Sequence, residues 1–177
     1  MFVRPKQIIH TIGIEPGMVV ADFGSGSGHY IIPVAKIVGI YGVVYAIDVQ
    51  KDLLSAIKSN AELNNLNNVR IIWGDLEKEK GSHLADQSVN VVIISNILFQ
   101  VEDKEAIAKE AFRVLKDGGR AFIIEWDEKF LRIGPPKEQR IKKEDCLELF
   151  EKIGFEKIED VNVGENHYGI IFIKRRS

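Results

Sequence analysis

The chain has 177 residues, a formal net charge of -2 and a single cysteine. Its length and its 45% hydrophobic and 28% charged residues are ordinary for one globular domain, so we expect a single domain over residues 1–177. The near-neutral charge gives no reason to expect nucleic acid or an anionic membrane as partner. One cysteine excludes a disulfide within the chain and a cysteine-based metal site.

The N-terminal segment from Met1 to Pro5 lacks the apolar core of a signal peptide. The longest apolar stretch, from Val91 to Phe99, contains Ser95 and Asn96 and is too short to span a bilayer. We therefore expect a cytoplasmic protein without a membrane partner. The tight basic cluster at residues 174–176 is explained by a solvated terminus.

The first predicted element is a helix that carries Ile8, Ile9 and Ile12, with Pro5 in its first turn and Gly13 after its end. Five short apolar runs follow, rich in Val and Ile, as is typical of strands buried on both faces of a parallel sheet. In chain order they are Met18–Phe23, Gly42–Ile47, Val69–Trp73, Val89–Ile94 and Arg120–Trp126.

Stretches with helical spacing lie between most of these strands. Apolar side chains share a face within each of three sets: Ile31, Val34, Ala35 and Val38; Leu53, Leu54, Ile57 and Ala61; and Ile107, Ala111, Val114 and Leu115. The third helix is expected to end near Lys116 and to be closed by Gly118 and Gly119. Strands alternating with helices predict an open α/β sheet with right-handed crossovers.

The C-terminal part of the chain has a different pattern. A helix with Cys146 and Phe150 on its apolar face is closed by Gly154, and two strand-like segments follow, Phe155–Val161 and Tyr168–Lys174. No helix fits between these two segments, so we expect them to be antiparallel neighbours. The predicted fold is a Rossmann-like open sheet of seven strands, mostly parallel, with one antiparallel strand from this hairpin and helices on both faces.

A glycine-rich turn between the first strand and the next helix is the main chemical signal. It reads Asp22-Phe-Gly24-Ser-Gly26-Ser-Gly28. Glycines let the backbone turn sharply and let a ligand approach closely, and a helix N-terminus offers free N–H groups. Dinucleotide-binding proteins have the spacing G-x-G-x-x-G, which would place the third glycine at His29, and no Walker Gly-Lys-Ser/Thr follows. Asp22, two residues before the first glycine, suits a ligand with an ammonium group, such as the amino acid end of S-adenosylmethionine.

Two further acids follow the next two strands. Asp48 ends the second strand, where a carboxylate can accept hydrogen bonds from both ribose hydroxyls, and Asp75 follows the third, where it can accept from an adenine amino group. Either acid alone could be a helix N-cap, and a glycine-rich turn can be simple turn chemistry. The joint spacing of the turn and the three acids favours a binding site at the carboxyl ends of the strands.

These residues resemble the class I S-adenosylmethionine-dependent methyltransferase family, and more narrowly the type 11 group that includes ubiquinone/menaquinone-biosynthesis C-methyltransferases. The resemblance runs from about Arg4 to Ile173 and also includes residues 86–96, 112–120, 134–136 and 151–155. It implies S-adenosylmethionine as cofactor and in-line methyl transfer to a small-molecule acceptor. The cofactor-binding residues that it implies are Asp22, Gly24, Ser25, Gly26, Gly28, Asp48, Val49, Gly74, Asp75, Leu76, Ser95 and Asn96.

The sequence identifies neither a catalytic side chain nor a metal site. Residues 95–100 should flank the transferred methyl group, and they lack the Asn/Asp-Pro-Pro-Tyr motif of enzymes that methylate amino groups of nucleic acid or glutamine. Cys146 is expected in the core, and the several cysteines of arsenite methyltransferases are absent.

Several other side chains allow two interpretations. His29 could face the pocket as a base or pack at the helix start; Asn96 and Gln100 could position an acceptor or satisfy loop backbone; Glu125, Trp126 and Asp127 could line the acceptor site or face solvent. His10 and His83 are expected at the surface or in helix packing, and His167 at the hairpin. The loop of residues 132–140 could be a lid or a rigid connector.

Three functions are therefore compared. The first is an active small-molecule methyltransferase. The second is an S-adenosylmethionine-binding partner subunit without transferase activity, because only about 17 residues precede the first strand, where relatives often carry helices over the acceptor site. The third, a nicotinamide-dependent oxidoreductase, is disfavoured by the glycine spacing. The sequence leaves the oligomeric state open.

Overall fold

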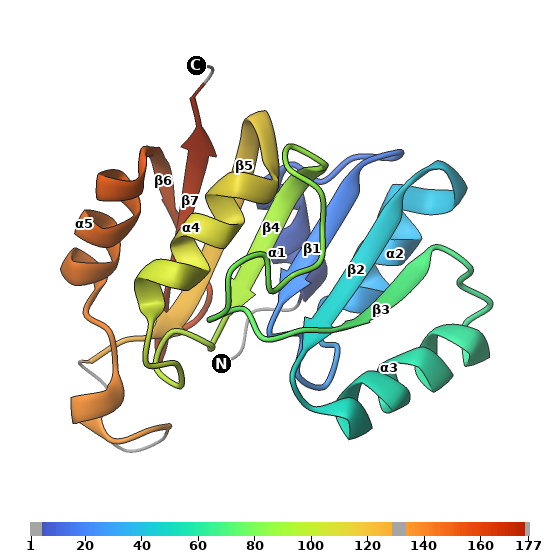
Figure 1. Cartoon of the computed structure of the whole chain (residues 1–177), viewed down its shortest axis with the longest axis horizontal. Coiled ribbons are helices and arrows are strands. Elements are labelled where there is room, and N and C mark those ends of the chain that lie inside the picture. The colour runs from blue at the N-terminus through green and yellow to red at the C-terminus, as the bar shows by residue number, and fades with distance from the viewer. Residues whose placement is uncertain (1–4, 129–133, 176–177) are drawn as a thin grey trace.

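A seven-stranded sheet runs through the molecule, with helices on both of its faces (Figure 1). The computed structural model describes residues 5–128 and 134–175. The strands are β1 (Val19–Phe23), β2 (Val43–Asp48), β3 (Val69–Trp73), β4 (Val89–Ser95), β5 (Leu115–Trp126), β6 (Phe155–Val161) and β7 (His167–Lys174). The helices are α1 (Pro5–Ile12), α2 (Ile31–Val38), α3 (Lys51–Leu63), α4 (Lys104–Val114) and α5 (Lys143–Ile153), with short 3-10 turns at Gly39–Tyr41 and Lys137–Gln139.

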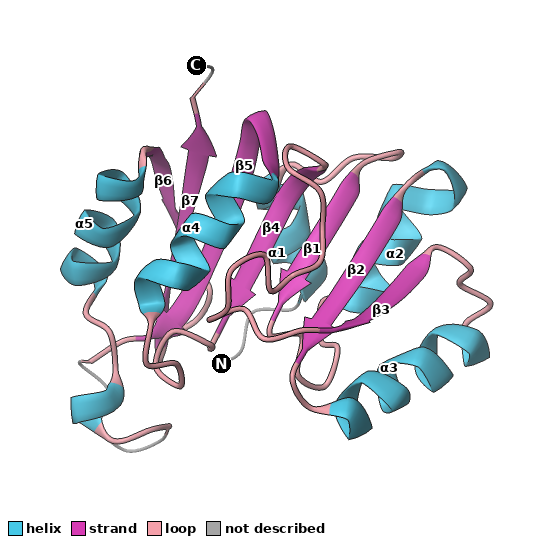
Figure 2. Ribbon diagram, in the orientation of Figure 1, coloured by secondary structure: helices cyan, strands magenta, loops and turns pink. Residues whose placement is uncertain are grey.

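The strand order is β3-β2-β1-β4-β5-β7-β6. β7 lies between β5 and β6 and is antiparallel to both. Its arrow points opposite to those of β1, β2 and β4 (Figure 2). The predicted α/β sheet with one reversed strand from the C-terminal hairpin is confirmed. The order of strands across the sheet changes direction at β1. From β1 the chain first adds β2 on one side and later adds β4 on the other side.

Each face of the sheet carries one hydrophobic core. Apolar residues of α4 and α5 pack on one face with Phe23, Ile94 and Ile123, whereas α1, α2 and α3 cover the other face with Ile93 and Phe122. The central strands are buried on both sides, which is why they read as continuous apolar runs. Complete burial of a side chain such as Ile93 contributes about 1.5–3 kcal/mol.

The boundary between α4 and β5 differs from the prediction. The helix ends at Val114 and β5 begins at Leu115, so Gly118 and Gly119 lie inside the strand instead of closing the helix. The register between β4 and β5 shifts here, because Val89 pairs with Leu115 while Val91 pairs with Arg120. Gly118 has a φ of +76°, which a glycine adopts without strain in such a bulge.

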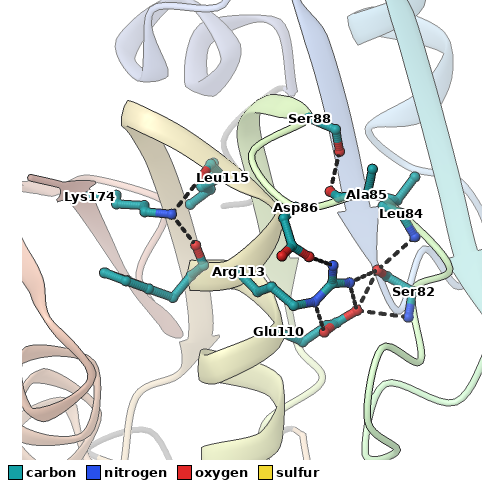
Figure 3. Close-up of polar contacts among 10 residues, drawn as sticks. Ser82, Leu84, Ala85, Asp86, Ser88, Glu110, Arg113, Leu115 and Lys174 are labelled. Carbon is teal, nitrogen blue, oxygen red and sulfur yellow. Dashed lines mark hydrogen bonds and ion pairs between the residues drawn. The ribbon is translucent and has the colours of Figure 1, made fainter. Parts of the chain in front are cut away.

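Lys174 is buried rather than solvated at the terminus. Its Nζ donates hydrogen bonds of 2.8 Å to the carbonyl oxygens of Phe112 and Leu115 (Figure 3). A cation thereby satisfies one carbonyl group in the last turn of α4 and one just beyond the end of the helix. The expectation of a solvated basic cluster is wrong for Lys174, and Arg176 lies outside the described residues.

Of the helices within the described ranges, none is both long and apolar enough to cross a bilayer. Gly154 has a φ of +114° and ends α5, as predicted, with its N–H donating to the carbonyls of Phe150 and Glu151.

Candidate functional site

The site lies at the edge of the sheet where the parallel strands end. Asp22 of β1 pairs in register with Ala46 of β2 and Ile93 of β4, and Asp48 and Ser95 are the last residues of β2 and β4. Strand order changes direction at β1, and open α/β sheets bind ligands in the crevice at such a switch point. The three acids predicted to gather at this edge are Asp22 within β1, Asp48 at the end of β2 and Asp75 just after β3, so the structure places all three at the same ends of neighbouring strands.

The glycine loop is held by backbone hydrogen bonds to β2. The N–H groups of Gly24 and Ser25 donate to the Ile47 carbonyl at 2.9 and 3.0 Å, and the N–H of Gly26 donates to Asp48 Oδ2 at 2.8 Å. A Cβ on Gly26 would meet only the Gly24 oxygen, at 3.9 Å, so it would point into open space. Gly26 thus leaves a cradle that any side chain would fill.

Gly28 has a different role. A Cβ there would lie 2.7 Å from Ile57 of α3, and Gly28 does not line either cavity described below. The third glycine of the motif allows the loop before α2 to pack closely on α3. Gly24 lines both cavities, but a Cβ there would lie 2.5 Å from Ile97, so only Gly26 of the three glycines opens onto free space.

Two adjoining cavities flank the loop. The first, of about 360 Å³, includes Asp22, Ser25, Ser95 and Asn96 in its lining. The second, of about 250 Å³, includes Asp48, Val49, Gly74, Asp75 and Leu76. Gly24, Gly26 and Gln100 line both cavities, so a single elongated ligand can lie across the loop and reach both.

The first cavity has buried polar groups in its lining. Asp22 is 2% exposed, and burial, reinforced by the charge of Asp48, raises its pKa to about 7. Ser25 Oγ and Asn96 Oδ1 are buried and have no hydrogen-bond partner among residues 5–128 and 134–175. A buried carboxyl beside unpaired polar atoms is costly unless a polar ligand completes it, and an ammonium group would do so.

The second cavity combines two acids with apolar walls. Asp48 accepts from the N–H groups of Gly26 and Gln50, at 2.8 and 2.9 Å, which leaves further lone pairs for hydroxyl donors. Asp75 is half-buried and accepts from the Glu77 N–H at 3.1 Å. The apolar lining residues are Val49, Leu76, Ile97, Val101 and Ile107, which suit a planar base between them.

The loop that carries Asp75 is anchored on α4 (Figure 3). Oε1 of Glu110 accepts from the Ser82 N–H at 3.0 Å and from the Ser82 hydroxyl at 2.5 Å. Arg113 donates to both Glu110 oxygens, at 2.9 and 2.7 Å, and to Asp86 at 2.5 Å. This network runs from the buried Ser82 and Glu110 to the exposed Asp86. It ties residues 82–86 to the helix and so limits the positions that Asp75 can adopt.

Glu125 supports the site from beneath. It is fully buried and lines neither cavity, so it neither faces solvent nor contacts an acceptor in the first cavity. Its Oε1 accepts from the Leu98 N–H at 2.7 Å, which fixes the loop after β4. Burial raises its pKa to about 7, although the N–H groups of Leu98, Ile97 and Trp126 and the charge of Lys104 act in the opposite direction.

Sequence reasoning missed part of the first cavity. Tyr30, Ile124, Val163 and His167 line it together with His29, for which a pocket-facing position was one of the two interpretations. His167 reaches the cavity because β7 is antiparallel, so its first residue pairs with Trp126, the last residue of β5. The sequence did predict that the last strand is reversed, and this prediction could have indicated that His167 lies near the end of β5.

The remaining sequence-based candidates lie elsewhere. His10 and His83 are exposed, as expected. Cys146 is fully buried in the core, and burial raises its pKa to about 12. No group of three or more His, Cys, Asp or Glu side chains within residues 5–128 and 134–175 could hold a metal ion.

The described part of the 132–140 loop packs away from both cavities. A Cβ on Gly134 would lie 2.6 Å from the Trp126 ring, and Arg140 donates to the carbonyls of Pro135 and Asp127 at 2.9 and 2.8 Å. Residues 134–140 therefore behave as a connector tied to the end of β5. Arg132 and Ile133 lie outside the described residues.

Residues 14–163 match the family model described as a methyltransferase domain. An arsenite methyltransferase of Halobacterium salinarum is 34% identical over 112 residues, which are 62% of this chain and 27% of that protein. The ubiquinone/menaquinone biosynthesis C-methyltransferase UbiE of Vibrio campbellii is 31% identical over 120 residues, 67% of this chain and 45% of that protein. The chain thus spans less than half the length of either of these curated relatives.

Solved structures match over nearly the whole chain. A SAM dependent methyltransferase from Aquifex aeolicus has a TM-score of 0.87 and 26% identity, covering 96% of this chain and 89% of that one. A putative type 11 methyltransferase from Sulfolobus solfataricus has a TM-score of 0.78 and 25% identity, covering 100% of this chain and 95% of that one. Both structures therefore share the overall fold of this chain.

Proposed function

The chain belongs to the methyltransferase domain family, and we propose that it transfers a methyl group from S-adenosylmethionine to a small organic acceptor. The observation that carries this proposal is the glycine loop between two adjoining cavities, with Asp22 buried in one and Asp48 in the other. We take residues 1–177 as one catalytic domain, and we retain the cytoplasmic location expected from the sequence.

The residues present fit each part of the cofactor. Asp22, with the unpartnered oxygens of Ser25 and Asn96, would hold the ammonium and carboxylate end, because these buried polar atoms need a charged or hydrogen-bonding partner. Asp48 would accept from the ribose hydroxyls, and Asp75 from the adenine amino group, with Val49, Leu76 and Gly74 around the base. Gly26 would let the ligand cross between the cavities without meeting a Cβ.

The bound cofactor would supply an electrophilic methyl group, and the protein's contribution is binding and orientation. Glu125 fixes the Ser95–Gln100 segment through Leu98, which would hold residues beside a bound methyl group in place. Fixed relative positions of two reacting groups can lower the barrier by about 7–11 kcal/mol in favourable cases.

The cavity composition favours an organic acceptor over arsenite. The single thiol of this chain, Cys146, is buried in the core and has a pKa of about 12, so it does not supply a thiolate ligand for arsenic. The first cavity instead has apolar walls at Ile8, Ile124 and Val163, which suit a small carbon-containing molecule.

Calorimetry on the whole chain with S-adenosylmethionine and S-adenosylhomocysteine tests cofactor binding. Release of S-adenosylhomocysteine in the presence of a panel of small metabolites then tests transfer. Binding without turnover on the panel would favour the second candidate, a cofactor-binding partner subunit. Binding of NAD(P) in place of S-adenosylmethionine would contradict the proposal.

A further inference from the structure

We infer that His167 accepts a proton from the methyl acceptor, and that the acceptor is an uncharged molecule with a weakly acidic hydroxyl or thiol. The inference rests on the proposed function and goes beyond it, because it assigns a catalytic residue and a chemical class of acceptor.

His167 has a fixed position at the start of β7, beside the end of β5. It pairs in register with Trp126, and its ring lies 4.1 Å from the Trp126 ring, between centroids, at an interplanar angle of 36°. The residue is 9% exposed and lines the first cavity together with Asp22 and Asn96. A side chain on a strand, packed against a second ring, is positioned more rigidly than one on a loop.

The second histidine of the cavity is a weaker candidate. His29 is exposed and follows the glycine loop, with its ring edge-on to Tyr30 at 5.2 Å. A solvent-exposed imidazole exchanges protons with water, whereas the buried ring of His167 is shielded within the cavity.

The surroundings keep the His167 imidazole neutral. Burial, and then the charge of Arg140 behind Trp126, lower its pKa from the ordinary value of 6.5. The other titratable groups of the cavity are Asp22 from β1 and His29 and Tyr30 from the start of α2, while Asp127 and Glu165 lie close in sequence to the β5–β7 pairing. A neutral imidazole at neutral pH is able to take up a proton.

The cavity lining restricts the acceptor. None of the described lining residues is Lys or Arg, so none of them offers a cation to pair with a phosphate or carboxylate. An imidazole with a lowered pKa is a weak base, so it assists groups such as phenols and thiols, whose pKa values are about 10 and about 8.5, better than aliphatic alcohols.

In the methyl-transfer step, each bond that forms is matched by one that breaks. The O–H or S–H proton moves to the imidazole as the acceptor's lone pair forms a bond to the methyl carbon, and the electrons of the methyl–sulfur bond stay on sulfur. The positive charge thus passes from the sulfonium to the imidazolium.

His167→Gln can be compared with His10→Gln, a control on the exposed side of α1, using phenol, thiophenol and 4-nitrophenol as probes. We expect wild-type protein and the control to methylate phenol and thiophenol, and His167→Gln to slow phenol methylation by about 100-fold or more. Transfer to 4-nitrophenol, which is largely ionised at slightly alkaline pH, should fall much less, because its proton is already lost.

Histidine NMR gives a readout independent of turnover. The chain has four histidines, so the imidazole signal lost in His167→Gln is assigned directly, and it should titrate below the ordinary histidine range. Equal losses on phenol and 4-nitrophenol would show a structural role and overturn the inference. Wild-type protein that binds S-adenosylhomocysteine but methylates none of the probes would overturn the acceptor class, whereas failure to bind it would overturn the proposed function itself.

Discussion

The backbone N–H of Gly26 donates a hydrogen bond of 2.8 Å to Oδ2 of Asp48, which joins the glycine loop after β1 to the end of β2. The carboxylate proposed to bind the ribose therefore also holds the loop that separates the two cavities. Loss of Asp48 should disturb both cavities at once, which makes it the most informative single position in the site.

Asp48→Ala should weaken S-adenosylhomocysteine binding by about 10- to 100-fold in calorimetry. Hydrogen bonds to a charged group contribute about 1.5–3 kcal/mol, and the variant loses those to the ligand as well as the loop anchor. Asp48→Asn keeps one oxygen acceptor and should lose less. An affinity of Asp48→Ala within twofold of wild type would contradict the assignment of this residue.

Gly26→Val should abolish detectable cofactor binding, because the new side chain would project into the space shared by the cavities. The backbone strain of a branched residue at a φ of +50° is a separate effect. Gly17→Val is a matched control, because Gly17 has a φ of +83°, nothing within 4 Å and no place in either cavity. A folded Gly26→Val protein with normal affinity would show that the ligand lies elsewhere.

The affinity for S-adenosylhomocysteine should fall as pH decreases through about 7. Asp22 must be ionised to pair with the ligand's ammonium group, and its pKa without ligand is about 7. One such group predicts about a tenfold loss of affinity between pH 8 and pH 6. Asp22→Asn should bind weakly with a flat pH profile in that range, so a wild-type slope that persists in this variant would assign the titration to another group.

Asp22→Asn should also stabilise the ligand-free protein at alkaline pH. The folded-state pKa of about 7 lies above the unfolded value of 3.8, so the aspartate destabilises the fold increasingly as pH rises from 3.8 to about 7. In urea unfolding, the advantage of the variant should grow by about 2–3 kcal/mol between pH 5 and pH 8. An advantage that does not change with pH would argue against a raised pKa for Asp22.

Glu110→Ala should lower the free energy of unfolding by about 1–3 kcal/mol in urea titration. The change leaves the buried Ser82 without its acceptor, whereas the half-buried Arg113 keeps its pair with Asp86. Glu105→Ala is a suitable control on the same helix, because Glu105 forms exposed pairs with Lys109 and Lys152 and should change stability little. Equal effects of the two substitutions would mean that the buried network in Figure 3 contributes little to stability.

The tertiary contacts also correct the roles of individual motif residues. Gly28 belongs to the same sequence motif as Gly24 and Gly26, yet it packs on Ile57 of α3, 29 residues later in the chain. Lys174 follows the pattern of a solvated basic tail, yet it caps α4 through Phe112, 62 residues earlier. Neither contact is visible in local spacing, because both partners are brought together only by the packing of the sheet.

Local patterns in the sequence were enough to predict the seven strands, the reversed C-terminal hairpin and the glycine turn. They also predicted that the three acids lie at the ends of strands. Such features depend on neighbouring residues, which set strand burial and backbone freedom. Only the tertiary structure decided that His167 shares a cavity with Asp22, that Glu125 lies beneath the loop after β4 and that Asp48 anchors Gly26. These properties depend on contacts and burial between segments far apart in the chain, and such burial also sets the pKa values on which the site's chemistry rests.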